Sequence, residues 1–250
     1  MDSTAPPGAP PAAAAWRALA RPRHRPWRDY FEALLIAVIF ATFARSFVLQ
    51  AFKIPSASME ENLLIGDHIL VNKFVYGPTP AGASLLPVRP VRRGDIVVFR
   101  FPDDPSRDFI KRCVGLPGDR IEVRDKIVLV NGRHLNEADY VFHSDERTYP
   151  RSIFLSEEYR NRDNFGPVSV PEGELFFLGD NRDDSNDSRF WGTVPIKYVK
   201  GRALLVYWSF HADQDSAGWQ GLGHRLRQLA EVVAKFPTRT RWSRSLRLIR

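Results

Sequence analysis

The stretch GDIVVFRFPDDPSRDFIKRCVGLPGDRIEVRDKIVLVNG, residues 94–132, decides the fold. Its apolar residues come in four short runs rich in β-branched and aromatic side chains, at residues 96–99, 109–114, 121–123 and 127–130. Runs of this kind, bounded by Gly, Pro, Asp and Asn, are typical of β-strands. The stretch ends in Asn-Gly, a hairpin signal because these two residues accept successive positive φ angles. It therefore predicts antiparallel strands joined by tight turns.

The pattern continues further along the chain, with runs of the same type at residues 175–178 and 203–210. Short strands separated by turn residues predict a mainly β fold, with an antiparallel β domain over residues 53–250. Residues 133–171 are polar, dense in charge and weakly periodic. We therefore expect an inserted subdomain at about these positions.

Composition limits the kind of partner. The chain has 250 residues, 44% of them hydrophobic, and can bury a sizeable core. Its net charge is +7, and the cationic excess lies mainly in residues 17–28 and 239–250. Charge at the chain ends suits an anionic lipid surface, and no nucleic-acid-binding signature is present, so we expect a lipid bilayer and no nucleic acid. The single cysteine, Cys113, excludes an intramolecular disulfide and a multi-cysteine metal site.

The N-terminal region resembles a membrane anchor with a basic leader. Residues 1–29 combine a Pro- and Ala-rich start with five arginines and predict a disordered cytoplasmic leader. The apolar run at residues 30–52 is long enough to cross a bilayer as a single helix. Arg45 interrupts it, so we expect the lipid-buried part to end near residues 43–47. Arginines before the run predict a cytoplasmic N-terminus by the positive-inside rule. The alternative is a cleavable signal peptide.

The other end of the chain, residues 211–250, is a basic tail. Within it, apolar residues over 222–236 recur at nearly helical spacing and predict a surface helix. That helix would pack on the domain or, alternatively, lie on a membrane.

A first candidate for chemistry is Ser58, in the block Ile54-Pro55-Ser56-Ala57-Ser58-Met59. Pro55 fixes the backbone just before Ser56 and Ser58, which suits holding both hydroxyls on one rigid turn. Alternatively, Ser58 and Glu61 fit a helix capping box.

A second candidate is Lys111, in a strand that places Phe109, Lys111 and Cys113 on one face. An ammonium between apolar groups loses hydration, so its pKa falls, and a value near ~8 would let it accept a proton. The alternative is a Lys111-Arg112 pair that extends from a sheet edge into water.

The third block, residues 179–189, is acidic. Asp183, Ser185 and Asp187 have the alternate spacing of a calcium loop, but Ser188 and Val194 stand where that loop needs Gly and Glu. We therefore predict no metal site here. Pairing Asp187 with Arg189 leaves Ser185 to donate to an amine. The alternative is a solvated turn.

The six histidines are scattered in unlike contexts, which gives a histidine-based triad no local support. A serine hydrolase without histidine needs another base, and lysine can serve as one.

Together, the three blocks resemble those of bacterial type I signal peptidases, membrane-anchored serine–lysine proteases that remove signal peptides. The resemblance covers roughly residues 30–210. It implies Ser58 as nucleophile and Lys111 as general base. It also implies supporting residues, namely Ser56 with Ser58 in the oxyanion hole, Ser185 orienting the lysine, and the ion pairs Arg112 with Asp180 and Asp187 with Arg189. The chain departs from the family at Glu61-Asn62, where Pro-Thr is common, and at Asp184, where Asn is frequent.

The resemblance further implies an endopeptidase without cofactor that cleaves precursor proteins after small residues of the Ala-x-Ala type. It implies a location in the bacterial inner membrane with the catalytic domain outside the cytoplasm. The sequence leaves the oligomeric state open. Two alternatives remain: another serine–lysine peptidase, such as a self-cleaving repressor-type protease, and a membrane-tethered β domain that binds exported chains without cutting them.

Overall fold

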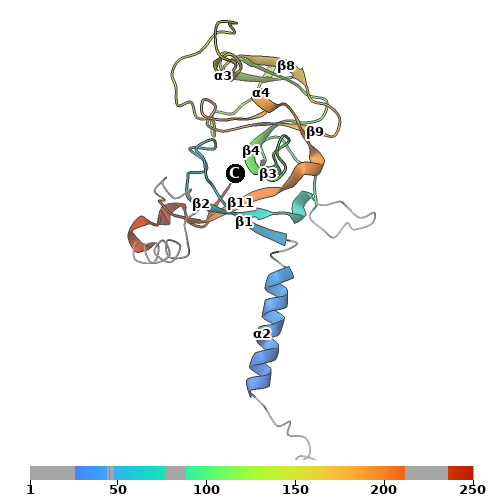
Figure 1. Cartoon of the computed structure of the whole chain (residues 1–250), viewed down its shortest axis with the longest axis vertical. Helices are drawn as coiled ribbons and strands as arrows, with labels where there is room; N and C mark the ends of the chain where they lie inside the picture. The colour runs from blue at the N-terminus through green and yellow to red at the C-terminus, as the bar shows by residue number, and fades with distance from the viewer. Residues whose placement is uncertain (1–25, 44, 46–47, 77–87, 212–235, 250) are drawn as a thin grey trace, which may run out of the picture. The chain divides into compact units, whose positions relative to one another are not determined.

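The computed structural model describes residues 26–43, 45, 48–76, 88–211 and 236–249 (Figure 1). The chain divides into two compact units, Met1–Ala44 and Arg45–Arg250. The first unit contains helix α2 (Pro26–Phe43). The predicted leader, residues 1–29, lies outside the described residues except for the start of this helix.

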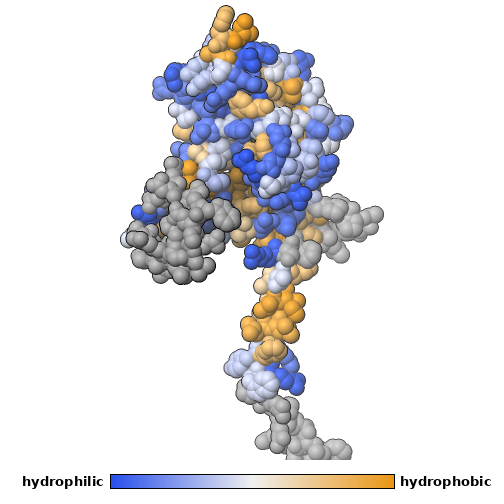
Figure 2. All heavy atoms as spheres, in the orientation of Figure 1, coloured by the Kyte–Doolittle hydropathy of each residue, from blue (hydrophilic) through white to orange (hydrophobic). Residues whose placement is uncertain are grey.

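Helix α2 ends at Phe43, where the lipid-buried stretch was expected to end. Its large apolar side chains, from Trp27 to Phe43, are 48% to 77% exposed, and Figure 2 shows them gathered along the helix. In the described part of the chain, no helix has both the length and the apolar character needed to cross a membrane. The predicted anchor over residues 30–52 extends too far, because Leu49–Lys53 forms strand β1.

The second unit is built mainly of antiparallel strands, as the sequence predicts. Its larger sheet has the strand order β1-β2-β11-β3-β4-β9-β10, and β12 pairs with β11. In chain order the strands are β1 (Leu49–Lys53), β2 (Asp67–Asn72), β3 (Ile96–Arg100), β4 (Asp108–Gly115), β9 (Glu174–Leu178), β10 (Val194–Pro195), β11 (Val199–Ser209) and β12 (Arg247–Leu248).

A second, four-stranded sheet has the order β7-β6-β5-β8. Its strands are β5 (Arg120–Arg124), β6 (Ile127–Val130), β7 (Arg133–His134) and β8 (Phe165–Ser169). Asn131 and Gly132 have φ angles of 53° and 77° and connect β6 to β7, which confirms the hairpin signal. The predicted insertion at residues 133–171 therefore begins inside this sheet, because β5 and β6 precede it in the chain.

Short helices complete the described fold. They are η2 (Phe74–Tyr76), α3 (Glu157–Arg162), α4 (Ser188–Trp191), η3 (Ile196–Tyr198) and η5 (Trp242–Arg244). The helix predicted over residues 222–236 lies outside the described residues apart from Phe236.

One apolar cluster fixes the segment that carries Ser58. Ile54, Met59 and Leu63 are at most 2% exposed and pack with residues of β2, β3 and β11. Fully burying a side chain of this size contributes about 1.5–3 kcal/mol. The segment at residues 54–63 is thus held against the larger sheet by three buried anchors.

Candidate active site

The structure brings the first two sequence blocks into contact through Ser58 and Lys111. The Lys111 ammonium nitrogen lies 2.5 Å from Ser58 Oγ, within hydrogen-bond distance. The two residues are only 4% and 6% exposed. The interpretation of Lys111 as a lysine extending from a sheet edge into water is therefore wrong, because strand β4 directs it inward.

The segment around Ser58 is a series of turns rather than a helix. Glu60 N donates to Ala57 O at 2.9 Å, and Leu63 N donates to Met59 O at 2.7 Å. The capping-box alternative for Ser58 is wrong, because no helix follows it and its hydroxyl contacts Lys111. Ser56 Oγ lies 3.4 Å from Ser58 Oγ, so both hydroxyls occupy one turn.

Burial determines the protonation state of Lys111. It lowers the pKa of the ammonium to about 8, while the carboxylates of Asp187 and Asp180 act against this shift. The Phe109 ring centroid lies 5.7 Å from the Lys111 nitrogen, on the same strand. A substantial fraction of Lys111 is neutral at mildly alkaline pH, so the group can accept a proton from a neighbouring hydroxyl.

Arg112, the residue after Lys111, binds Asp180 through two parallel hydrogen bonds. Its Nε and Nη2 each lie 2.7 Å from a carboxylate oxygen, and both side chains are at most 3% exposed. Asn62 Nδ2 also donates to Asp180, at 2.9 Å. This contact connects the third block to the segment after Ser58. The expected ion pair is thus present, and Asn62 is a member that the sequence analysis did not identify.

Asp187 and Arg189 form the second expected ion pair, with Nε and Nη2 each 2.8 Å from a carboxylate oxygen. Burial alone would raise the pKa of the Asp187 carboxyl, but Arg189 and the Gly179 N–H hold it below its ordinary value. Asp187 also caps α4 by accepting from Arg189 N. The solvated-turn interpretation is wrong, because Asp180 and Asp187 are fully buried.

Ser185 lies in the same loop and is 8% exposed. Its hydroxyl lies close to the Asp187 carboxylate and helps to hold the pKa of that carboxyl below its ordinary value. It approaches Gly179, where an added Cβ would collide with Ser185 Oγ and would lie 2.5 Å from Ser58 O. The loop therefore packs tightly against the Ser58 turn, with Gly179 leaving just enough room.

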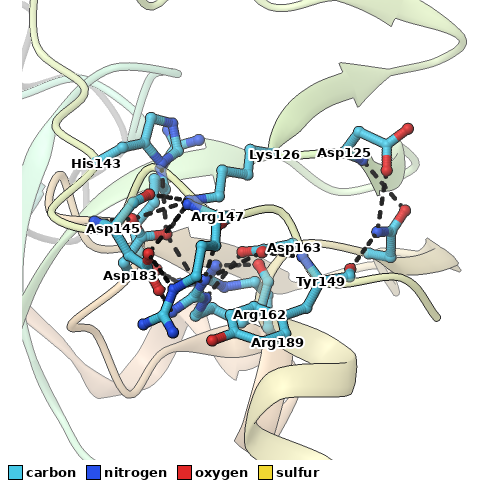
Figure 3. Close-up of polar contacts among 12 residues, drawn as sticks. Asp125, Lys126, His143, Asp145, Arg147, Tyr149, Arg162, Asp163, Asp183 and Arg189 are labelled. Atoms are coloured by element: carbon cyan, nitrogen blue, oxygen red, sulfur yellow. Dashed lines mark hydrogen bonds and ion pairs between the residues drawn. The ribbon is translucent and has the colours of Figure 1, made fainter. Parts of the chain in front are cut away.

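Asp183 joins the third block to the second sheet and to residues 143–162 (Figure 3). Its buried carboxylate accepts from Lys126 Nζ at 3.0 Å and from Asp145 N at 2.9 Å. Arg162 Nε lies 3.6 Å away. Arg162 O in turn accepts from Arg189 at 2.5 Å. In the sequence, Asp183 stands out only for its calcium-loop spacing. Lys126 and Arg162 carry no local signal, because their contacts depend on the tertiary fold.

Comparison with known proteins identifies the family. The family model described as signal peptidase, peptidase S26, matches residues 27–208. The chain belongs to this family. It is 34% identical over 207 residues to a signal peptidase I of Pseudomonas aeruginosa, covering 73% of this chain and 72% of that protein. A signal peptidase I of Aquifex aeolicus is 34% identical over 230 residues, covering 73% and 84%.

A solved structure of a signal peptidase I from Enterococcus faecalis is 32% identical and has a TM-score of 0.34, covering 46% of this chain and 97% of that one. The family assignment rests on the sequence matches. The activity is accordingly that of a signal peptidase I, a serine endopeptidase of signal-peptide processing, in a family of membrane-bound bacterial enzymes.

Proposed function

We propose that this signal peptidase cleaves its substrates with Ser58 as nucleophile and Lys111 as general base. The observation that carries the proposal is the 2.5 Å contact between the two side chains in a buried site. At pH 7 a lysine with a pKa of about 8 is neutral in roughly a tenth of the molecules, whereas an ordinary lysine near ~10.4 is neutral in fewer than about one in a thousand, so far more of Lys111 can accept the hydroxyl proton. The pair thus meets both requirements of an activated serine, namely contact with a base and a base of suitable pKa.

In the proposed reaction, neutral Lys111 takes the proton of Ser58 as Oγ attacks the scissile carbonyl. The resulting ammonium gives this proton to the leaving amine, and an acyl-enzyme ester on Ser58 remains. Lys111 then accepts a proton from water, the hydroxide attacks the ester, and the proton returns to Ser58 as the acid product leaves.

The developing oxyanion would be held by the Ser58 backbone N–H and the Ser56 hydroxyl. The proximity of the two hydroxyls, 3.4 Å apart, supports Ser56 in this role. Ser185 would orient Lys111, because its buried hydroxyl lies next to Gly179, where the loop packs against the Ser58 turn. Arg112 with Asp180 and Asp187 with Arg189 would keep the loop of the third block in place.

The sheet offers a place for an extended substrate beside the dyad. In β4, residues Arg112, Cys113 and Gly115 pair with β9, whereas residues 108–111 pair with β3 alone in the described structure. One edge of β4 next to Lys111 is therefore open to strand addition, which supplies affinity through main-chain hydrogen bonds. We assign this edge to the precursor segment before the cut, with small residues, typically Ala, at positions minus one and minus three.

The test of the dyad uses the full chain and a precursor whose cleavage site ends in Ala-x-Ala. Ser58→Ala and Lys111→Ala are each expected to abolish cleavage, while Lys197→Ala, a substitution in η3, keeps it. Cleavage that persists in Ser58→Ala would refute the dyad.

For membrane placement we propose that helix α2 contacts the lipid, with the N-terminus in the cytoplasm and the catalytic unit on the other side of the bacterial inner membrane. The exposure of its large apolar side chains supports this role. In intact spheroplasts, external protease should digest the catalytic unit and spare a tag at Met1. Digestion of the tag with protection of the catalytic unit would reverse the orientation.

A further inference from the structure

The C-terminal segment, residues 236–249, lies beyond the part of the chain that matches the family model, which ends at residue 208. It nevertheless packs on the catalytic unit through η5 and β12. We infer that Arg244 and Arg241 of this segment are positioning residues, which fix the consecutive turns between Ser58 and Asp67 by binding their carbonyl groups. The inference rests on the proposed role of Ser58 as nucleophile.

Arg244 binds the end of the Ser58 turn directly. Its Nη2 donates to Asn62 O at 2.8 Å and to Asp67 Oδ2 at 2.7 Å. Asp67 is fully buried, and the same carboxylate oxygen accepts from Leu64 N at 2.9 Å. Arg244 thus forms an ion pair with the buried Asp67 carboxylate. The same carboxylate binds the backbone N–H of Leu64 and so stabilises the turn after Leu63.

Arg241 binds the next turn along the chain, residues 64–67, which Asp67 N closes by donating to Leu64 O. Its Nη2 donates to Ile65 O at 2.6 Å and to Phe210 O at 3.2 Å. The main chain holds the arginine in place, since Arg241 N donates to Ser209 O at 2.9 Å. Gly66 allows this close approach, because its φ angle is +88° and an added Cβ would collide with Phe210 O.

Asn62 and Ile65, whose carbonyl groups the two arginines bind, are only partly buried. A charged donor makes a stronger hydrogen bond than a neutral one, so these contacts add to the apolar packing of Ile54, Met59 and Leu63 in holding the turns. Apolar packing does not replace them on the Asn62 side, because a cavity of about 490 Å³ is lined by Asn62 and by residues 246–249. Loss of an arginine would therefore let the turn move relative to β4, which carries Lys111.

Such a movement affects the reaction more than it affects binding. A displacement of ~1 Å in a catalytic group reduces turnover by about 100-fold. It would also admit water to Lys111, whose lowered pKa comes from burial. If the turn moves, we therefore expect two changes together: a lower kcat, and a pH profile of kcat/KM that is shifted toward higher pH.

The experiment compares Arg244→Ala, Arg244→Lys and the control Arg247→Ala in the full chain, using an Ala-x-Ala precursor. Arg247 lies in the same segment and is exposed. We expect Arg244→Ala to lower kcat by about 10- to 100-fold with KM unchanged and to raise the apparent pKa of kcat/KM. Arg244→Lys should restore part of the rate, and Arg247→Ala should match the unaltered chain.

A purely structural role gives a different result. Thermal unfolding would then show that fewer molecules are folded, but the molecules that do fold would keep the original kcat and pH profile. That result overturns the inference. If Arg244→Ala does not fold, the same measurements on Arg244→Lys decide, and an unchanged kcat and pH profile there refutes the positioning role. Ser58→Ala is run in parallel. Activity in that variant refutes the proposed function, whereas an inactive Ser58→Ala beside a normal Arg244→Ala refutes this inference alone.

Discussion

The backbone N–H of Asn181 donates to the carbonyl oxygen of Ser58, at 3.2 Å. Two sequence blocks separated by more than a hundred residues are thus joined by the main chain at the residue proposed as nucleophile. Asn181 Nδ2 adds a longer contact to Ala57 O, at 3.4 Å. Because the principal contact needs no side chain, the position of the third block relative to Ser58 depends on how closely the two backbones approach.

Gly179 makes this approach possible, so Gly179→Ala should damage the site. The added methyl group would meet Ser185 Oγ and Ser58 O, and overpacking of this kind costs about 1–3 kcal/mol. We expect a loss of about 100-fold in kcat from the displaced turn. Gly173→Ala is the control: nothing lies near its Cβ, and its positive φ should cost about 1 kcal/mol with kcat unchanged. Normal turnover by Gly179→Ala would show that the two backbones can separate without harm.

The pH dependence of kcat/KM should report the Lys111 ammonium. Only the neutral amine accepts the Ser58 proton, and burial lowers its pKa to about 8. Activity should therefore rise with pH through about 8, with roughly a tenth of the plateau value at pH 7. The measurement is initial rates of precursor cleavage between pH 6 and 10. An acid limb near 10 would mean that the amine is hydrated in the working enzyme.

Replacing Lys111 by Met should abolish cleavage and stabilise the fold at neutral pH. In the unfolded chain the lysine pKa is ~10.4, so the folded state disfavours the ammonium by about 3 kcal/mol at pH 7. The unfolded chain binds more protons between about 8 and 10.4, so stability of the unaltered protein rises with pH across this window. The variant lacks this rise.

Loss of the hydrogen bond to Ser58 offsets about 1 kcal/mol, which leaves a net gain of about 2 kcal/mol at pH 7. Urea unfolding at pH 7 and at pH 11 measures both contributions. At pH 11 the gain should be replaced by a loss of about 1 kcal/mol, because the lysine is then neutral in the folded and the unfolded chain. A Met variant less stable than the unaltered protein at pH 7 would contradict a poorly hydrated, destabilising ammonium.

Removing one member of the Arg112–Asp180 ion pair should destabilise the fold more than removing both members. Removing only the arginine leaves a buried carboxylate without its cation, at a cost of about 3–5 kcal/mol. Arg112→Met with Asp180→Leu should lose less than Arg112→Met alone, because no charge remains to be buried. Thermal unfolding of the two variants measures the difference. Equal losses would show that packing of the arginine, which lies 4.0 Å from the Tyr140 ring centroid, outweighs its charge.

Local sequence was sufficient for the strands whose apolar runs are continuous. Strands β3, β4, β5, β6 and β9 lie where their β-branched and aromatic runs predicted them, with ends shifted by at most one residue. Strand β1 was missed because Leu49–Lys53 was taken as the outer end of the apolar run that forms α2. Arg45 signals where the helix ends, but it does not signal that a strand follows, since that strand depends on pairing with β2.

In the site, too, some residues could be predicted from local sequence and others could not. Ser58 and Lys111 carried a chemical signal, a hydroxyl on a rigid turn and an amine among apolar groups, and the structure places them in contact. Asn62, Lys126 and Arg244 carried none, because each acts through a partner far away in the sequence. Such charged contacts are specified only by the tertiary fold.

The network around Asp183 gives the last prediction, a change in acid stability for Lys126→Met. Burial alone would raise the pKa of Asp183, but the Asp145 N–H, Lys126 and Arg162 hold it below its ordinary value. The stability that this carboxylate contributes is therefore present at neutral pH and is lost as pH falls through its folded-state pKa. Without Lys126 that pKa rises, and acid unfolding should begin at higher pH.

At pH 7 the variant should lose about 1.5–3 kcal/mol, the range for hydrogen bonds to charged groups. Lys200→Met is the matched control, because Lys200 pairs with Asp108 at 2.7 Å where both side chains are about a quarter exposed, and it should cost less than about 1 kcal/mol. Circular dichroism during acid titration of both variants gives the two midpoints. Coinciding midpoints would mean that Arg162 and the Asp145 N–H satisfy Asp183 without Lys126, and that the turn between β5 and β6 is attached to the catalytic loop by packing alone.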